Sequence, residues 1–165
     1  MSEINRIQRQ MKLLHLDEGW ASITLKTLLD DISTQQALAQ PISGKHGIWE
    51  IVLHLGTAQQ LVLDLIQGIA RPFAPGDEWP PVEDTSNKAW DNVRQTLLDA
   101  DEEIRGEMQG FADFALEQSF VEGGSSAYDT FHGYIQHAYY HAGQISILKG
   151  MEAGKYDCSI RPIDT

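Results

Sequence analysis

Apolar side chains recur every three or four residues along most of this chain, which is the spacing of one face of an α-helix. The first such stretch ends near Gly19, and its apolar positions are Ile4, Ile7, Met11 and Leu14. A shorter stretch follows over 25–32, and the Ser33-x-x-Gln36 pattern is typical of a capping box that opens one more short turn. No stretch shows the alternation of a β-strand, so the pattern predicts an all-α fold.

The stretch 48–67 is apolar on most of its sides, which is typical of the most buried helix of a bundle. Gly68 is a plausible stop signal. The segment 71–86 then holds four prolines and Gly76. It predicts a long loop, either a crossover from one end of a bundle to the other or a lid.

A third long helix is expected after Asp84 or Ser86, either of which fits as its N-cap. Its apolar stripe is Trp90, Val93, Leu97, Ala100, Ile104 and Met108. The other side carries many charges, Asp101 among them, and is predicted to be a solvated surface.

An irregular connection containing Phe111, Phe114 and Phe120 is expected next. Ser126-x-x-Asp129 then predicts the start of the last long helix, which should run to about Lys149 with Gly150 as its C-cap. The pattern as a whole predicts a four-helix bundle with a long crossover loop and additional short helices, folded as one domain over 1–165.

The formal net charge of −12 narrows the possible partners. The 12 basic residues are scattered, which argues against nucleic acid and against an anionic membrane surface. The residues at the start lack the apolar core of a signal peptide, and 48–69 is too polar for a membrane span, so we expect a cytoplasmic protein. The single cysteine, Cys158, rules out an intramolecular disulfide and is expected to be an inert thiol.

The candidate chemistry lies in the histidines. His137 and His141 are four residues apart, so on a helix they share one face and can bind a single divalent metal. His54 has an apolar face within the buried helix and should point inward. Three neutral imidazoles would leave coordination positions open, as in a catalytic metal site. The alternative is that they are core histidines bonded to neighbours.

The remaining histidines give weaker signals. His15, at the end of the first helix, is expected at the surface or in a cap, and His132 should face away from His137. His46 is a candidate cap or pocket residue. Glu50 lies one turn before His54 and is a fourth ligand, a base beside the metal or an acid favoured by the helix dipole.

Other catalytic patterns are missing from the sequence. There is no HExxH or ExxH pair, which argues against zincins and di-iron carboxylate bundles, and there is no glycine-rich phosphate loop with a lysine.

Three segments resemble one known family, the DinB-like (damage-inducible) metal-binding four-helix bundles. Residues 47–55 read GIWEIVLHL and residues 132–145 read HGYIQHAYYHAGQI, which is close to the family signature. The weaker third segment is the Trp79-Pro80 loop that leads into Trp90.

This resemblance implies a metal site formed by His54, His137 and His141, the same three histidines that the spacing indicates. It also implies zinc or nickel as the metal and a homodimer as the assembly. Some relatives are metal-dependent transferases that join low-molecular-weight thiols such as bacillithiol or mycothiol to electrophiles, or isomerases that need such a thiol. Many relatives carry Asp where this chain has Ala138, so an acidic group is missing at that position.

The leading hypothesis is therefore a metal-dependent thiol S-transferase or a hydrolase-like enzyme. The metal would activate a bound thiol or water, and Gln144, Tyr134 and Glu50 are candidates to orient its ligands. The alternative is a non-enzymatic, metal-stabilised scaffold or stress-response interaction protein. A third possibility is a helical protein with three buried histidines and no metal.

Overall fold

Helices form nearly all the regular structure of the protein. A computed structural model describes residues 1–16, 24–72 and 74–152. The helices are α1 (Glu3–His15), α2 (Leu25–Leu29), α3 (Thr34–Leu38), α4 (Ile48–Ile66), α5 (Asn87–Glu107), the 3-10 helices η1 (Met108–Gly110) and η2 (Asp113–Glu117), and α6 (Ala127–Glu152). These ranges contain no β-strand, only an isolated bridge between Ser119 and Ser126, so the all-α prediction is confirmed. Gly19, near which the first helix was expected to end, and Cys158 both lie outside the described residues.

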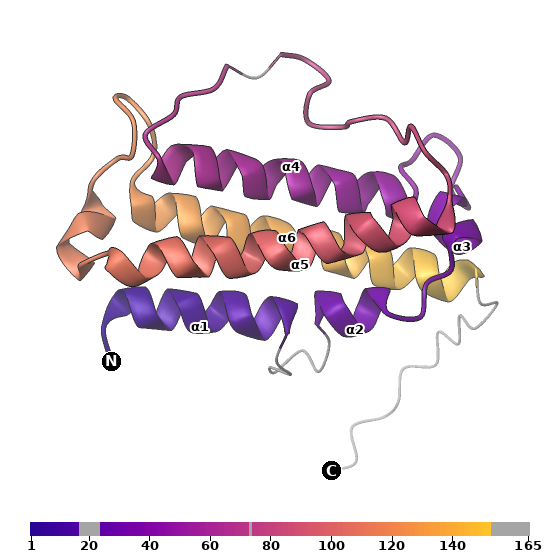
Figure 1. The fold of residues 1–165 in the computed structure, drawn as a ribbon, viewed down its shortest axis with the longest axis horizontal. Helices are drawn as coiled ribbons and strands as arrows, with labels where there is room; N and C mark the ends of the chain where they lie inside the picture. The colour runs from indigo at the N-terminus through magenta and orange to yellow at the C-terminus, as the bar shows by residue number, and fades with distance from the viewer. Residues whose placement is uncertain (17–23, 73, 153–165) are drawn as a thin grey trace, which may run out of the picture.

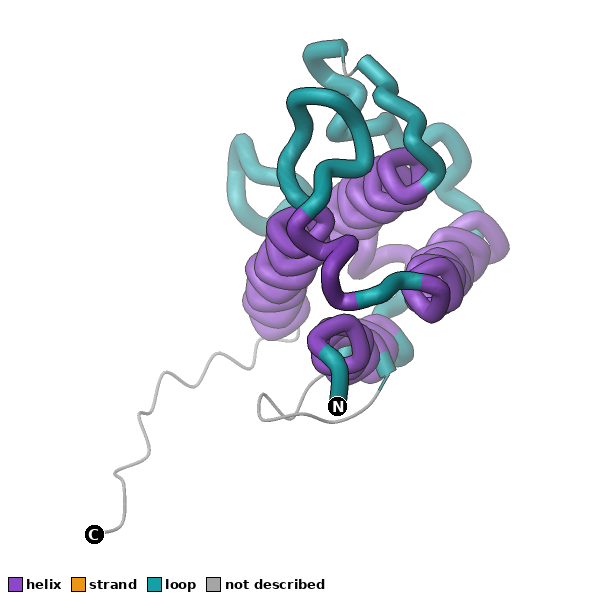
Figure 2. The backbone as a smooth tube through the Cα atoms, turned by 90° about the vertical axis from the view of Figure 1, so that its left-hand side faces the viewer, coloured by secondary structure: helices purple, strands orange, loops and turns teal. Residues whose placement is uncertain are grey.

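The long helices lie side by side with nearly parallel axes (Figure 1). α4 packs against both α5 and α6, and α1 packs against the same two helices from the other side. α1 and α2 follow one another end to end (Figure 1), and Figure 2 shows the helices nearly end on. α6 contacts α1, α2 and α4, and so forms a common wall of the interior.

The segment between α4 and α5 crosses the length of the molecule. Figure 1 shows it leaving the end of α4, passing over that helix and reaching the start of α5, so α4 and α5 point the same way. The segment therefore takes the crossover course, one of the two alternatives that its prolines left open. Its course also brings Glu78 and Trp79 over the middle of the chain's most apolar helix, α4.

Local signals set most helix ends. The Ser86 hydroxyl accepts a hydrogen bond from the Ala89 N–H at 3.1 Å, so Ser86, and not Asp84, is the N-cap of α5. Gly68 has a φ of +74° directly after α4, a left-handed conformation that glycine adopts without strain. The predicted C-cap at Gly150 is wrong, because α6 continues to Glu152.

The interior is built from the predicted apolar stripes. Trp49 of α4 and Trp90 of α5 lie with ring centroids 5.1 Å apart, and both are almost fully buried. The Trp90 indole N–H donates to the Ile32 carbonyl at 2.8 Å, which fixes the turn after α2. Burying rings of this size is the main stabilising contribution of such a core.

Two polar predictions are wrong in the same place. His15, expected at the surface or in a cap, and Asp101, expected on the solvated side of α5, are both fully buried. The two side chains approach each other to 2.8 Å, and the Arg105 Nε–H donates to the other oxygen of Asp101 at 2.8 Å. Arg105 thus satisfies one carboxylate oxygen, whereas the oxygen that faces His15 has no hydrogen-bond partner among the described residues, because His15 Nδ1 is within bonding distance of the Met11 carbonyl at 3.1 Å.

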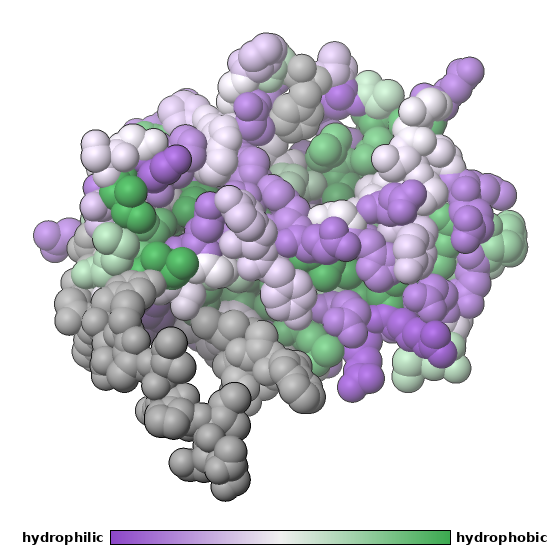
Figure 3. All heavy atoms as spheres, turned by 180° about the vertical axis from the view of Figure 1, so that it is seen from behind, coloured by the Kyte–Doolittle hydropathy of each residue, from purple (hydrophilic) through white to green (hydrophobic). Residues whose placement is uncertain are grey.

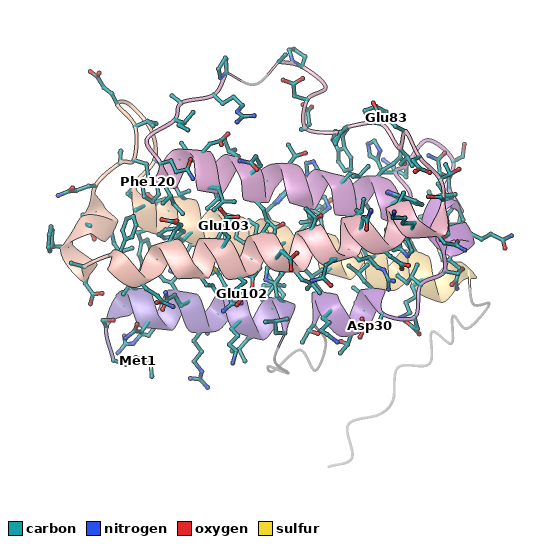
Figure 4. All side chains as sticks on the ribbon, viewed as in Figure 1. Met1, Asp30, Glu83, Glu102, Glu103 and Phe120 are labelled. Carbon is teal, nitrogen blue, oxygen red and sulfur yellow. The ribbon has the colours of Figure 1, made fainter. Side chains whose placement is uncertain are left out.

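Several acidic residues of α5 are exposed as predicted. Glu102 and Glu103, next to Asp101 in sequence, are exposed and project from the helix (Figure 4). The prediction for this side of α5 therefore fails at Asp101, and in part at Arg94 and Arg105, whose side chains are 24% and 18% exposed.

Candidate metal centre

Three histidine rings from two helices meet at one point in the structure. The Nε2 atom of His137 lies 2.9 Å from Nε2 of His54 and 3.0 Å from Nε2 of His141. One ring nitrogen from each of the three residues lies within 4.8 Å of the others. The structure thus brings together all three histidines that the sequence indicated.

The fold explains this convergence. His137 and His141 are one turn apart on α6 and therefore project from the same face. His54 lies on α4, which packs directly against α6. His141 is 4% exposed, whereas the other two rings are half-buried, so the group lies at the boundary between core and solvent.

The outer nitrogens determine which ring atom faces inward. His54 Nδ1 lies 2.6 Å from the Glu78 carbonyl oxygen, and His141 Nδ1 lies 2.6 Å from Gln144 Oε1. Both partners are acceptors, so each Nδ1 carries a proton and donates it. The Nε2 atoms of His54 and His141 therefore present lone pairs towards His137.

Protons alone cannot provide good hydrogen bonds to all of the facing Nε2 atoms. A proton on His137 Nε2 can be directed well at only one of the two facing lone pairs. A divalent cation accepts a lone pair from each of several imidazoles at once, and the fixed Nδ1 hydrogen bonds are typical of metal-binding histidines. The donor set therefore fits a metal ion.

The pKa values of His137 and His141 also fit metal binding. Burial, and then the nearby His54, lowers the pKa of His137. Burial, followed by the charge of His137, lowers the pKa of His141 to about 4, although the hydrogen bond from its ring to Gln144 opposes the shift. Both rings are consequently neutral near pH 7, and the neutral imidazole is the form that ligates metals.

An aromatic stack covers one side of the group. The Trp79 ring lies parallel to His54 at 4.0 Å and to His46 at 3.6 Å, so the indole is held between two imidazoles. The sequence pattern gave Trp79 only as part of a weak family resemblance. Its role, and that of the Glu78 carbonyl, depends on the path of a long loop, which has no periodic signal.

Of the residues expected to orient the metal ligands, Gln144 contacts one of the three histidines and Tyr134 does not. Gln144 does hold a ligand candidate, His141. Tyr134 instead contacts His15 Nε2 through its hydroxyl at 3.0 Å and accepts from the Gln59 amide at 2.9 Å, so it belongs to the buried network around Asp101.

Glu50 caps its own helix. Its carboxylate accepts from the Gly47 N–H at 2.8 Å and from the Gln40 amide at 2.9 Å. Partial burial opposes the shift, but these hydrogen bonds and the nearby His46 outweigh it and lower the pKa of Glu50. Among the described residues, the group that could hold a metal does not include Glu50.

Two positions of the family-like segment lie outside the histidine group. His132 packs against Tyr128, with ring centroids 4.3 Å apart. Ala138 is fully buried in the apolar core, so the position where many relatives carry an acid is enclosed in this protein.

Two cavities adjoin the three histidines. One, of about 350 Å³, is lined by His54 and His137 together with apolar residues of α4. The other, of about 640 Å³, is lined by His54 and His141 together with Lys45, His46 and Trp79. The group is therefore accessible to small molecules.

Comparison with known families shows that the model of the DinB superfamily matches residues 15–145. Neither the curated proteins nor the solved structures gave a significant match. Across the described residues, none of the helices has the length and apolarity needed to cross a membrane.

Proposed function

The chain belongs to the DinB superfamily, and on this premise we propose that His54, His137 and His141 bind one divalent metal ion, with zinc or nickel the leading candidates. The observation that carries the proposal is the convergence of one ring nitrogen from each histidine, with the outer nitrogens of His54 and His141 already engaged in hydrogen bonds. Imidazole suits both metals, and selection between them depends partly on availability.

The spacing of the nitrogens supports the assignment. Nitrogen ligands at about 2.0–2.1 Å from a tetrahedral zinc ion lie roughly 3.3 Å apart. The separations of His137 Nε2 from His54 Nε2 and His141 Nε2, 2.9 and 3.0 Å, are within a few tenths of an ångström of this value. Small rotations of the rings would therefore be enough to admit the ion.

We further propose that the site transfers a low-molecular-weight thiol to a small electrophile. A bound divalent ion would lower the pKa of a thiol or water at its open positions and so supply a nucleophile near neutral pH. In the transfer, the thiol loses its proton, its sulfur bonds to the electrophilic carbon, and the bond to the leaving group breaks with its electron pair.

The protein's own residues would position this reaction. Glu78 and Gln144 hold the rings of His54 and His141 in the ligating tautomer. Trp79 shields one face of His54 from water. The two cavities give the reactants access to the histidines.

The experiment is a screen of small thiols against a generic electrophile, with the wild type and His137→Ala compared after metal loading. The proposal expects conjugation above the uncatalysed rate in the wild type and none in the variant. Equal rates in both proteins would refute the transferase, because the reaction would then not depend on the histidine group.

The alternative is a metal-stabilised scaffold without catalysis. The histidines join α4, α6 and the loop that carries Glu78, so a metal would cross-link three segments. On this account a chelator lowers the melting temperature sharply, yet no thiol conjugation is detected. Conjugation that disappears on chelation would instead support the enzyme.

The proposed partners are a small thiol, an electrophile and a second copy of the chain, and the proposed location is the cytoplasm. Hydrophobic atoms are visible on the face shown in Figure 3, beside the end of α6. On this helix Tyr140 and Ile147 are among the exposed large hydrophobic residues. Sedimentation measurements over a range of concentrations would test for the homodimer.

A further inference from the structure

The three histidines separate two cavities of different character. His54 lines both, His137 lines only the smaller one, and His141 lines only the larger one. The covering loop is divided in the same way, because Glu78 lines the smaller cavity and Trp79 the larger. A ligand bound at the histidines therefore has two distinct spaces into which it can extend.

The smaller cavity, which we call the apolar cavity, is walled mainly by aliphatic side chains. They are Ala58, Leu61, Val62 and Leu65 of α4. Its acidic lining residues, Glu78 and Asp129, use their carboxylates to accept from the Gly76 N–H and the Ser126 hydroxyl. Neither Lys nor Arg is among the described residues that line it.

The larger cavity, which we call the basic cavity, also has aliphatic walls, formed by Ile42, Ile51, Ile147 and Leu148, but its charged lining differs. Lys45 and His46 line it together with the amide of Gln144, and the described lining residues include no Asp or Glu.

The two linings differ in how they would receive a charged ligand. Aliphatic walls gain free energy when they remove apolar groups from water, whereas an anion there would lie near Glu78 and Asp129 without a compensating cation. An anion in the basic cavity is attracted by Lys45 and can accept hydrogen bonds.

Resting on the proposed metal function, we propose that the site takes ligands from two sides: an uncharged alkyl or aryl group enters the apolar cavity, and a small ligand bearing a carboxylate enters the basic cavity beside Lys45. The site then sorts its two reactants by charge. Both reach the histidines, because each cavity is lined by His54 and by one histidine of α6.

The test uses three hydroxamates that share one metal-binding head. Acetohydroxamate reports on the metal alone, octanohydroxamate adds an alkyl tail, and succinic monohydroxamate adds a carboxylate. Affinities for the metal-loaded protein are measured by calorimetry. Each fully buried CH₂ group can strengthen binding by roughly fourfold, so octanohydroxamate should bind at least about tenfold more tightly than acetohydroxamate.

Variants assign each tail to its cavity. Ala58→Phe fills the apolar cavity and should remove the gain of octanohydroxamate, while Lys45→Ala should weaken only succinic monohydroxamate, by about two- to fivefold. Ile69→Ala, an exposed position outside both cavities, is the matched control. Leu61→Gln is a second apolar-cavity variant in case Ala58→Phe does not fold.

The outcomes distinguish a failure of the metal function from a failure of the two-sided assignment. If acetohydroxamate does not bind, the metal function itself fails. If acetohydroxamate binds but the alkyl tail adds nothing, or adds affinity that Ala58→Phe and Leu61→Gln leave intact, the two-sided assignment is overturned and the metal function stands. An effect of Lys45→Ala on all three probes would also overturn it.

Discussion

His15 of α1 and Asp101 of α5 meet inside the protein, with Nδ1 of the histidine 2.8 Å from Oδ1 of the aspartate and both side chains fully buried. The pair continues through His15 Nε2 to the Tyr134 hydroxyl at 3.0 Å. Tyr134 also lines the apolar cavity. One buried polar network therefore connects α1 and α5 to the wall of the candidate site on α6.

Asp101→Ala should destabilise the protein by about 3–5 kcal/mol, because it removes the buried carboxylate that accepts from the Arg105 Nε–H and that faces His15 at 2.8 Å. Denaturant unfolding measures this change. Glu102→Ala, at the exposed neighbouring position (Figure 4), is the control and should change the free energy of unfolding by less than about 0.5 kcal/mol. A similar loss of unfolding free energy in both variants would mean that the buried Asp101 stabilises the protein no more than the exposed Glu102 does.

Gln144→Leu should lower the metal affinity by roughly 10- to 100-fold, since it removes the acceptor that orients the His141 ring. Competition with a chromogenic chelator measures the affinity. Gln136→Leu makes the same chemical change at an exposed position of α6 and should leave the affinity unaltered. If the two variants bind metal equally well, the hydrogen bond to Gln144 does not support the site.

Trp79→Ala should weaken metal binding by roughly tenfold while leaving the helical content intact, because the indole holds His54 from one face. Trp79→Phe keeps a flat ring there and should restore most of the affinity. Circular dichroism and the same chelator competition provide the two readouts. An alanine variant with wild-type affinity would show that the stack has no part in orienting His54.

The metal-free protein should lose stability as the pH falls from about 6.5 towards 4. In this window the unfolded chain binds a proton at His141, whereas burial and then His137 hold the folded-state pKa at about 4. The unfolded state therefore binds more protons, and the free energy of unfolding falls by up to about 1.4 kcal/mol per pH unit. Above this window His141 adds no pH dependence.

Urea unfolding of chelator-treated protein across this pH range tests the point. His141→Gln removes the titrating group and should show a shallower decline than the wild type. The same slope in both proteins would contradict the assignment of the lost stability to His141.

Ala138→Asp should destabilise the protein by several kcal/mol, since this methyl group is fully buried in the apolar core. Gln136→Asp, exposed on the same helix, is the control and should be close to neutral. An Ala138→Asp protein that is as stable as the wild type and binds metal more tightly would show that the carboxylate reaches the histidines, as the family pattern suggests.

Much of the fold and the identity of the histidine group could be predicted from sequence because both depend on local periodicity. A spacing of four residues places His137 and His141 on one face, and the apolar surroundings of His54 turn it inward. Glu78 and Trp79 were not predicted to contact the group, because their positions depend on a proline-rich loop whose path has no repeating pattern. The burial of His15 and Asp101 was mispredicted because the pairing of α1 with α5 is a long-range contact.

The central claim is that imidazoles from α4 and α6 hold one common ion. Elemental analysis of protein purified without an affinity tag tests it most directly. The account predicts about one divalent ion per chain in the wild type and in His132→Ala, and loss of the ion in His137→Ala. A stoichiometric ion retained after replacing His54, His137 and His141 together with alanine would contradict it.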